Sequence, residues 1–217
     1  MPGIDSVLPP YEEMDGDLAD AGAIDALRSV LAGLGTEGLL ERGRLIEAYF
    51  NRQGITFSLA GRERPLPLDL VPRLLSAAEW NIIEQGVAQR IRALEMFLAD
   101  VYGPQQVLDD EIVPRRLVTS SSQFHRAAWG IEPSNGVRLH VVGIDLIRDE
   151  AGVFAVLEDN LRCPSGVSYV LENRRTLSHV VPELFTSYRL RGVEEYPTRL
   201  LGALVAAAPL GVAEPTV

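Results

Sequence analysis

The sequence lacks lysine, and all 20 of its basic residues are arginine. The 30 acidic residues outnumber them and give the chain a formal net charge of -10. A chain with this charge is repelled by the phosphate backbone of nucleic acid, so we expect no nucleic-acid partner. Any reaction that needs a lysine side chain must also take it from outside these residues.

Cysteine is almost absent as well, because Cys163 is the only one. A disulfide framework is therefore excluded, and the three histidines show no metal-ligand spacing that would indicate zinc. The N-terminus has no basic segment followed by an apolar run, which favours a cytoplasmic protein. The longest apolar stretch, Leu200 to Ala213, contains Pro209 and is shorter than the roughly 20 residues that cross a bilayer. We therefore expect no membrane span.

With 217 residues and 47% hydrophobic content, the chain can bury a core. Residues 1–20 are acidic and proline-containing without apolar periodicity, which predicts a flexible arm. Residues 21–135 are expected to form a helical region with one short strand. Residues 136–217 are expected to form a strand hairpin followed by helices. The predicted fold class is α+β, an antiparallel sheet with helices packed around it.

The helices are predicted from apolar residues at steps of three and four. A first helix from about Ala23 is expected to break at Gly33 and Gly35, and a second to end near Gly54. The next segment, "ITFSLAG", alternates like a short strand, and the proline-rich "RPLPLDLVPRLL" after it is expected to be irregular.

The strongest helix begins after Ser76, where "SAAE" predicts a capping box between Ser76 and Glu79. Apolar residues from Trp80 to Val101 recur along one face, which predicts core packing. Arg90 and Arg92 are expected on a solvated face, with an arginine in the active-site cleft as the alternative.

Two β-branched runs, Val137 to Asp149 and Val153 to Asn160, flank a tight turn and predict a β-hairpin. If Glu150 and Ala151 form a two-residue loop, Asp145, Glu158 and Asn160 share one face of this hairpin. The absence of a side chain at Gly143 would then leave space beside Glu158.

Two carboxylates and an amide oxygen are ligands that Mg²⁺ prefers, together with water and substrate phosphates. The alternative is that these residues only cover the solvent face of an edge hairpin. Both interpretations stay open at this point, because one extra loop residue would turn the two strands' faces apart.

Three segments together resemble a known family: "FNRQGITFS", "RPLPLDLVPRLLSAAEW" and "GIDLIRDEAGVFAVLEDNLRCPSGVSYVLENR". They are similar to the circularly permuted ATP-grasp family, type 2, which is related to the glutathionylspermidine synthase-like ligases. The resemblance extends from about Ala23 to the C-terminus. The chain departs from glutathionylspermidine synthases at Gly143, where those enzymes tend to carry an arginine.

The resemblance implies roles for particular residues. Glu158-Asp159-Asn160 matches the family's metal-binding Glu-x-Asn, and Asp145 matches the acidic ligand on the neighbouring strand. Arg162 stands where several members carry an arginine that contacts phosphate or the acyl-phosphate, which implies a catalytic role.

Two further groups of residues are candidates for substrate binding. Asn51, Arg52 and Gln53 could line a substrate loop, or they could simply finish a helix. Ser165 in "PSGVSY" could cap a helix whose amides face an anion, or act as a cap alone.

The implied reaction is ATP-dependent ligation of a small-molecule or peptide carboxylate to an amine, with Mg²⁺ and ATP. Family members are longer, and their lysines that hold ATP follow the metal half in the permuted order. We therefore expect an N-terminal, incomplete part of the fold that binds ATP weakly or not at all by itself. The alternative is a non-catalytic binding or assembly module derived from the same fold.

Overall fold

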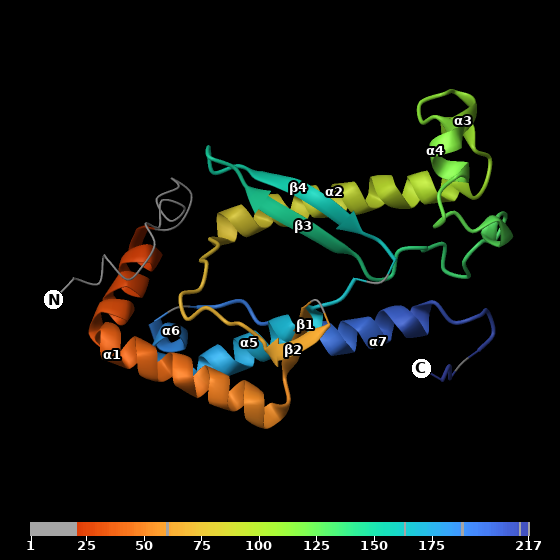
Figure 1. Ribbon diagram of the computed structural model, residues 1–217. Coiled ribbons are helices and arrows are strands. Elements are labelled where there is room, and N and C mark those ends of the chain that lie inside the picture. Colours follow the sequence, from red (N-terminus) through yellow and green to blue (C-terminus); the bar gives the residue numbers. More distant parts are fainter. Residues whose placement is uncertain (1–20, 60, 163, 188, 213, 217) are drawn as a thin grey trace. The chain divides into compact units, whose positions relative to one another are not determined.

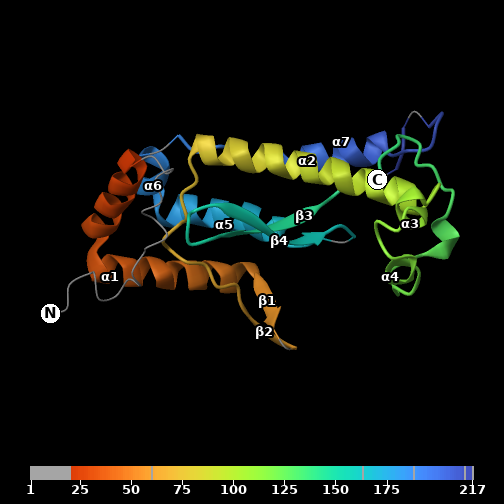
Figure 2. The same cartoon turned by 90° about the horizontal axis from the view of Figure 1, so that it is seen from above.

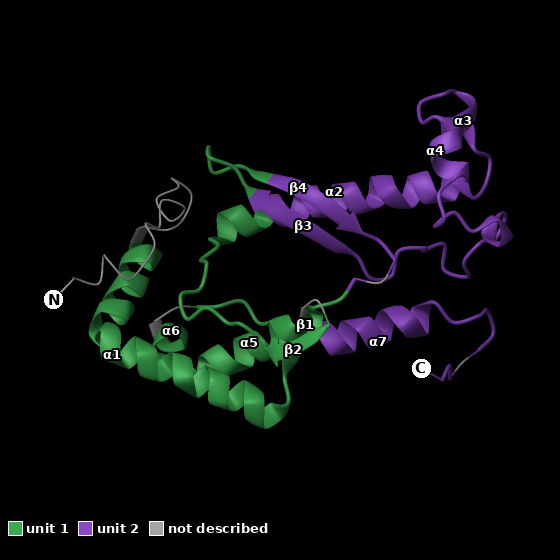
Figure 3. Ribbon diagram, in the orientation of Figure 1, with its two compact units in different colours: residues 1–81, 148–154, 165–193 green, residues 82–147, 155–164, 194–217 purple. Residues whose placement is uncertain are grey.

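The computed structural model describes residues 21–59, 61–162, 164–187, 189–212 and 214–216, so the arm expected over residues 1–20 lies outside the described residues. Its elements are mixed helices and two small antiparallel sheets, which confirms the α+β class. Figure 1 labels the helices and strands, and Figure 2 shows them from above. The chain divides into two compact units, coloured separately in Figure 3: residues 1–81, 148–154 and 165–193, and residues 82–147, 155–164 and 194–217.

In unit 1, helix α1 (Ala21–Gln53) contains the predicted break, because Gly35 has φ 63° and ψ 179°. The helix ends where the sequence predicted, at Gly54, whose φ of 66° is left-handed. The N–H of Ile55 donates to the carbonyl of Phe50 at 2.9 Å, which closes the last turn in the pattern typical of a C-terminal glycine.

Strands β1 (Thr56–Leu59) and β2 (Arg62–Pro65) form the first antiparallel pair, in which Thr56 lies opposite Pro65. The prediction that the proline-rich segment is irregular from Arg64 onward is therefore wrong for its first two residues. Pro65 is tolerated because it stands at the end of a two-stranded sheet, where its missing N–H removes no essential ladder bond.

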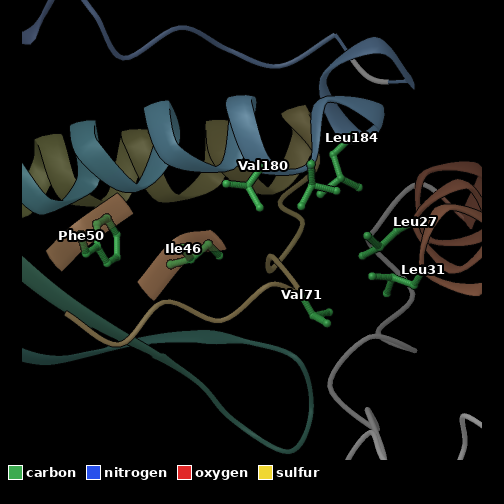
Figure 4. Close-up of a cluster of buried hydrophobic side chains, with 8 residues drawn as sticks. Leu27, Leu31, Ile46, Phe50, Val71, Val180 and Leu184 are labelled. Carbon is green, nitrogen blue, oxygen red and sulfur yellow. The ribbon is translucent and has the colours of Figure 1, made fainter. Parts of the chain in front are cut away.

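The apolar core of unit 1 lies between α1, helix α5 (Val167–Val180) and helix α6 (Pro182–Ser187). Phe50 and Leu27 have no exposed surface. Figure 4 shows the cluster, whose buried members are Leu27, Leu31, Ile46, Phe50, Val71, Val180, Val181 and Leu184. Burying each large apolar side chain stabilises the fold by roughly 1.5–3 kcal/mol, so this cluster is the main stabilising feature of the unit.

Unit 2 begins within helix α2 (Ala77–Val101). The apolar stripe of this helix is mostly half-buried, and Val101, at 2% exposed, is its one buried member. In unit 1, Trp80 at the start of the stripe is 40% exposed. The prediction of core packing is therefore confirmed at the C-terminal end of the stripe and wrong at Trp80.

Short elements follow α2: α3 (Gln106–Asp109), α4 (Arg115–Thr119) and the 3-10 helix η3 (Arg126–Ala128). Asp100 stabilises the first turn of α3. Its two carboxylate oxygens accept the backbone N–H groups of Gln106 and Val107, each at 3.0 Å. Helix α7 (Tyr196–Ala206) is the last helix of the described residues. No helix among the described residues is long and apolar enough to cross a membrane.

Candidate functional site: the β3–β4 hairpin

Strands β3 (Gly143–Arg148) and β4 (Phe154–Asn160) form the predicted hairpin (Figure 1). The first strand is shorter than predicted, because residues 137–142 are not part of it. The predicted two-residue loop is wrong. Asp149 N–H donates to the Val153 carbonyl at 3.0 Å, so the loop has three residues, 150–152. The Asp149 carboxylate accepts the N–H groups of Ala151 and Val153, and Gly152 has φ 78°. This is the three-residue turn that ends in a left-handed glycine.

A three-residue loop alone would move Asp145 to the opposite face from Glu158, but the far end of the hairpin has a different register. If the strands paired without interruption from Asp149 and Val153 onward, Gly143 would lie opposite Asp159. A Cβ built on Gly143 instead lies 3.4 Å from the Cβ of Asn160. The residue observed beside Gly143 is thus one position further along β4 than uninterrupted pairing predicts, which is what a β-bulge produces.

The exposure of β4 indicates where the extra residue lies. Half-buried and exposed side chains alternate from Phe154 to Leu157, after which Leu157 and Glu158 are both exposed and Asp159 and Asn160 are both half-buried. We place the bulge at Leu157 and Glu158. Glu158 then faces the side of exposed Asp145, and Asp159, the first residue after the bulge, faces the side of half-buried Leu146.

Among the predicted metal ligands, Glu158 and Asn160 contact each other directly, since Asn160 Nδ2 donates to Glu158 Oε1 at 3.0 Å. Within the described residues, no hydrogen bond joins Asp145 to either of them. Arg162 is exposed just beyond the strand and donates to Gln123 Oε1 at 2.8 Å. No group of three or more His, Cys, Asp or Glu side chains in the described residues could hold a metal ion. The predicted set has two such side chains, and its third member is an amide.

Asp159 is held on the other face by α2. Arg90 Nε and Nη2 donate to its two carboxylate oxygens, each at 2.7 Å. The hydrogen bonds from Arg90 lower the pKa of Asp159 below its ordinary value, and the same contact raises the pKa of Arg90. Arg90 is exposed, as the sequence predicted, but it also pairs with Asp159, and sequence spacing carries no signal that these two residues meet.

Gly143 also has a different role from the predicted one. A Cβ at this position would lie 2.9 Å from the Cβ of Pro164, closer than real Cβ atoms approach. The missing side chain therefore permits close packing of the chain that leaves β4, and Pro164 and Asn160 lie against the space that it leaves.

The predicted substrate residues lie at the ends of two helices in unit 1. Asn51, Arg52 and Gln53 are exposed in the last turn of α1, and the Arg52 guanidinium lies 5.9 Å from the Tyr49 ring centroid. Ser165 is exposed but does not cap α5. Gly166, with φ 100°, occupies the N-cap position, and no side chain bonds the first turn.

Unit 1 contains a pocket of about 920 Å³. It is lined mainly by leucine and proline side chains of α1 and residues 64–71, and none of the predicted site residues lines it.

Residues 72–217 match the model of a family described as a circularly permuted ATPgrasp. The chain belongs to the circularly permuted ATP-grasp family. The matched range includes α2, the hairpin and every residue that follows it. Membership of the type 2, glutathionylspermidine synthase-like branch stays a prediction.

Several curated proteins are similar to this chain. "Uncharacterized protein Rv2411c" of Mycobacterium tuberculosis is 55% identical over 208 residues, which are 95% of this chain and 38% of that protein. "Uncharacterized protein sll0335" of Synechocystis is 47% identical over 174 residues, 78% of this chain and 36% of that protein. "Putative glutamate--cysteine ligase 2-2" of Frankia casuarinae is 41% identical over 186 residues, 85% of this chain and 22% of that protein. The chain thus spans less than two fifths of the length of each of these relatives.

Proposed function

We propose that this chain supplies the metal-binding and part of the phosphate-binding surface of an ATP-dependent carboxylate-amine ligase. In this proposal Asp145, Glu158 and Asn160 hold Mg²⁺, and Arg162 contacts phosphate. Membership of the ATP-grasp family supports the reaction class. The observation that carries the residue assignment is the direct contact between exposed Glu158 and half-buried Asn160 at the end of β4.

The donor set fits a hard divalent cation. Glu158 and Asp145 supply carboxylates, and Mg²⁺ is commonly held by one or two carboxylates plus substrate phosphates. Because Asn160 donates through Nδ2, its Oδ1 oxygen remains available as a further ligand. When bound, Mg²⁺ would neutralise charge on the phosphates of ATP.

The reaction joins two substrates in two balanced steps. A carboxylate oxygen attacks the terminal phosphorus of ATP and ADP leaves. An amine then attacks the acyl carbon, phosphate leaves and the amine loses a proton. Arg162 is exposed and close in sequence to Asn160, where its guanidinium can pair with phosphate oxygens. The chain has no lysine, so the lysines that usually hold the nucleotide in this family must come from outside these residues.

Mn²⁺ titration followed by electron paramagnetic resonance, with ATP present, tests the assignment. Glu158→Gln should weaken Mn²⁺ binding by about tenfold or more, because it removes a charged ligand. Glu150→Gln is the matched control, since it removes the same charge from an exposed residue of the hairpin loop. Equal Mn²⁺ affinity for Glu158→Gln and wild type would refute the metal site. A folded wild-type chain that binds no Mn²⁺, even when the lysine-bearing remainder of the fold is supplied, would favour a non-catalytic binding module.

A further inference from the structure

Asp159 stands between Glu158 and Asn160 in the sequence but faces the opposite side of the hairpin. Its side chain is 18% exposed, and it lies against α2. Glu158 is exposed on the other face, where it accepts the hydrogen bond from Asn160. The direction of Asp159 therefore determines the direction of both of its neighbours, because successive side chains of a strand point to opposite faces.

Arg90 fixes that direction with two parallel hydrogen bonds of 2.7 Å to the two oxygens of Asp159. A two-pronged guanidinium–carboxylate contact sets the orientation of the carboxylate as well as its distance. Arg90 projects from the middle of α2, a helix of 25 residues, so the contact is made from a rigid element.

The hairpin needs such a contact at this point. The bulge at Leu157 and Glu158 interrupts the regular pairing at the first of the two proposed ligands on β4. Where pairing is interrupted, the backbone ladder no longer fixes which face each side chain takes, and a slip of one residue would reverse the faces. The Arg90–Asp159 contact lies directly after the bulge.

We propose that Arg90 and Asp159 are positioning residues, which hold the end of β4 so that Glu158 and Asn160 face the metal together. The expected effect on metal binding rests on the proposed function, but the orientation of the Glu158 and Asn160 side chains can be measured without metal. Neither residue would touch Mg²⁺ or substrate. An ordinary surface ion pair contributes little to stability, so a role in stability alone predicts no change at Glu158 or Asn160.

The first measurement is Mn²⁺ affinity in the presence of ATP. Arg90→Gln should weaken binding by about tenfold, the usual effect of removing a group that orients a metal ligand. Arg90→Lys keeps the charge but not the two-pronged geometry, so its affinity should lie between those of wild type and Arg90→Gln. Arg92→Gln is the control, because Arg92 is exposed on the same helix and has no polar partner in the described chain.

The second measurement is the side-chain amide signal of Asn160 in a ¹⁵N NMR spectrum without metal. In wild type this amide donates to Glu158, so its protons should be shifted and slow to exchange. Arg90→Gln should move the signal toward that of a solvated amide, and Arg92→Gln should not.

The outcomes separate the two proposals. If Glu158→Gln loses Mn²⁺ while folded Arg90→Gln keeps wild-type affinity and an unchanged Asn160 signal, the positioning role is wrong and the metal site stands. If Arg90→Gln moves the Asn160 signal but Glu158→Gln binds Mn²⁺ normally, the orientation stands and the metal site is wrong. If Arg90→Gln does not fold, Arg90→Lys decides the question by the same two measurements.

Discussion

Arg148 donates a 2.5 Å hydrogen bond to Glu79 Oε1, although 69 residues separate the two in the sequence. The other oxygen of this carboxylate accepts the backbone N–H of Ser76 at 2.7 Å, and Glu79 N–H donates to Ser76 Oγ at 3.2 Å. Glu79 is 1% exposed. One buried carboxylate therefore caps α2 and holds the base of the hairpin turn, where Arg148 also lies 4.5 Å from the centroid of the Phe154 ring.

Replacing Glu79 should be strongly destabilising. Glu79→Ala leaves Arg148, which is 17% exposed, without its carboxylate, and losing one partner of a buried pair costs about 3–5 kcal/mol. Ser76→Ala removes only the cap, at about 1 kcal/mol. Urea denaturation measures both, with Gln85→Ala, an exposed residue of the same helix, as the control. If Glu79→Ala costs no more than Ser76→Ala, the contact with Arg148 contributes nothing.

The sequence could predict half of this arrangement. The capping box was predictable because Ser76 and Glu79 are three residues apart, and the structure confirms it. The partnership with Arg148 was not, since nothing in local spacing says which strand residue reaches a given helix residue. The contact between Arg90 and Asp159 was missed for the same reason.

The hairpin shows the same limit within one motif. Its existence followed from the β-branched runs and the glycine between them. The three-residue loop had a local signal, because Gly152 stands at the third loop position, where a left-handed residue is needed. The bulge at Leu157 and Glu158 had no such local signal, because the run "VLED" contains no glycine. Only the packing of β4 against α2 shows which of its polar side chains takes which face.

Gly143 is predicted to tolerate no side chain. The Cβ of an alanine would lie 2.9 Å from Pro164 Cβ, and neither a proline ring nor the adjoining strand can yield cheaply. We expect Gly143→Ala to destabilise the fold by about 1–3 kcal/mol, the usual cost of overpacking. Gly86→Ala is the matched control: its Cβ meets open space on α2, so it should stabilise the helix by roughly 0.5–1 kcal/mol. Thermal unfolding of the two variants should therefore shift in opposite directions.

Gly35 should be required for the break in α1. Its φ of 63° with ψ of 179° is a conformation open essentially to glycine alone. Gly35→Ala should cost about 1–3 kcal/mol even though no atom lies within 4 Å of the new Cβ. Gly33→Ala, two residues earlier in helical backbone with equally open space, should be neutral or stabilising in the same urea denaturation. Equal effects of the two substitutions would contradict a strained break at Gly35.

Tyr49 should make the stability of unit 1 depend on alkaline pH. Its hydroxyl donates to Glu172 Oε1 at 2.9 Å, joining α1 to α5. That hydrogen bond, together with burial and the negative charge of Glu172, raises the pKa of Tyr49 above its ordinary value, against the weaker opposing effect of Arg175 and Arg52. A phenolate cannot donate the bond and is repelled by the carboxylate.

The sign follows from the raised pKa in the folded state. The stabilisation is fully present below the pKa of the unfolded chain, about 10, and is lost as pH rises through the higher pKa of the folded chain. Tyr49→Phe should therefore cost about 1 kcal/mol near neutral pH, where the hydrogen bond is intact. The difference between wild type and Tyr49→Phe should shrink as pH rises past about 10, because only wild type loses a bond there. Tyr196→Phe, which removes a hydroxyl with no hydrogen bond in the described chain, controls for the tyrosine background in urea denaturation across this pH range. A constant difference between wild type and Tyr49→Phe at all pH values would show that the bond to Glu172 does not hold the two helices together.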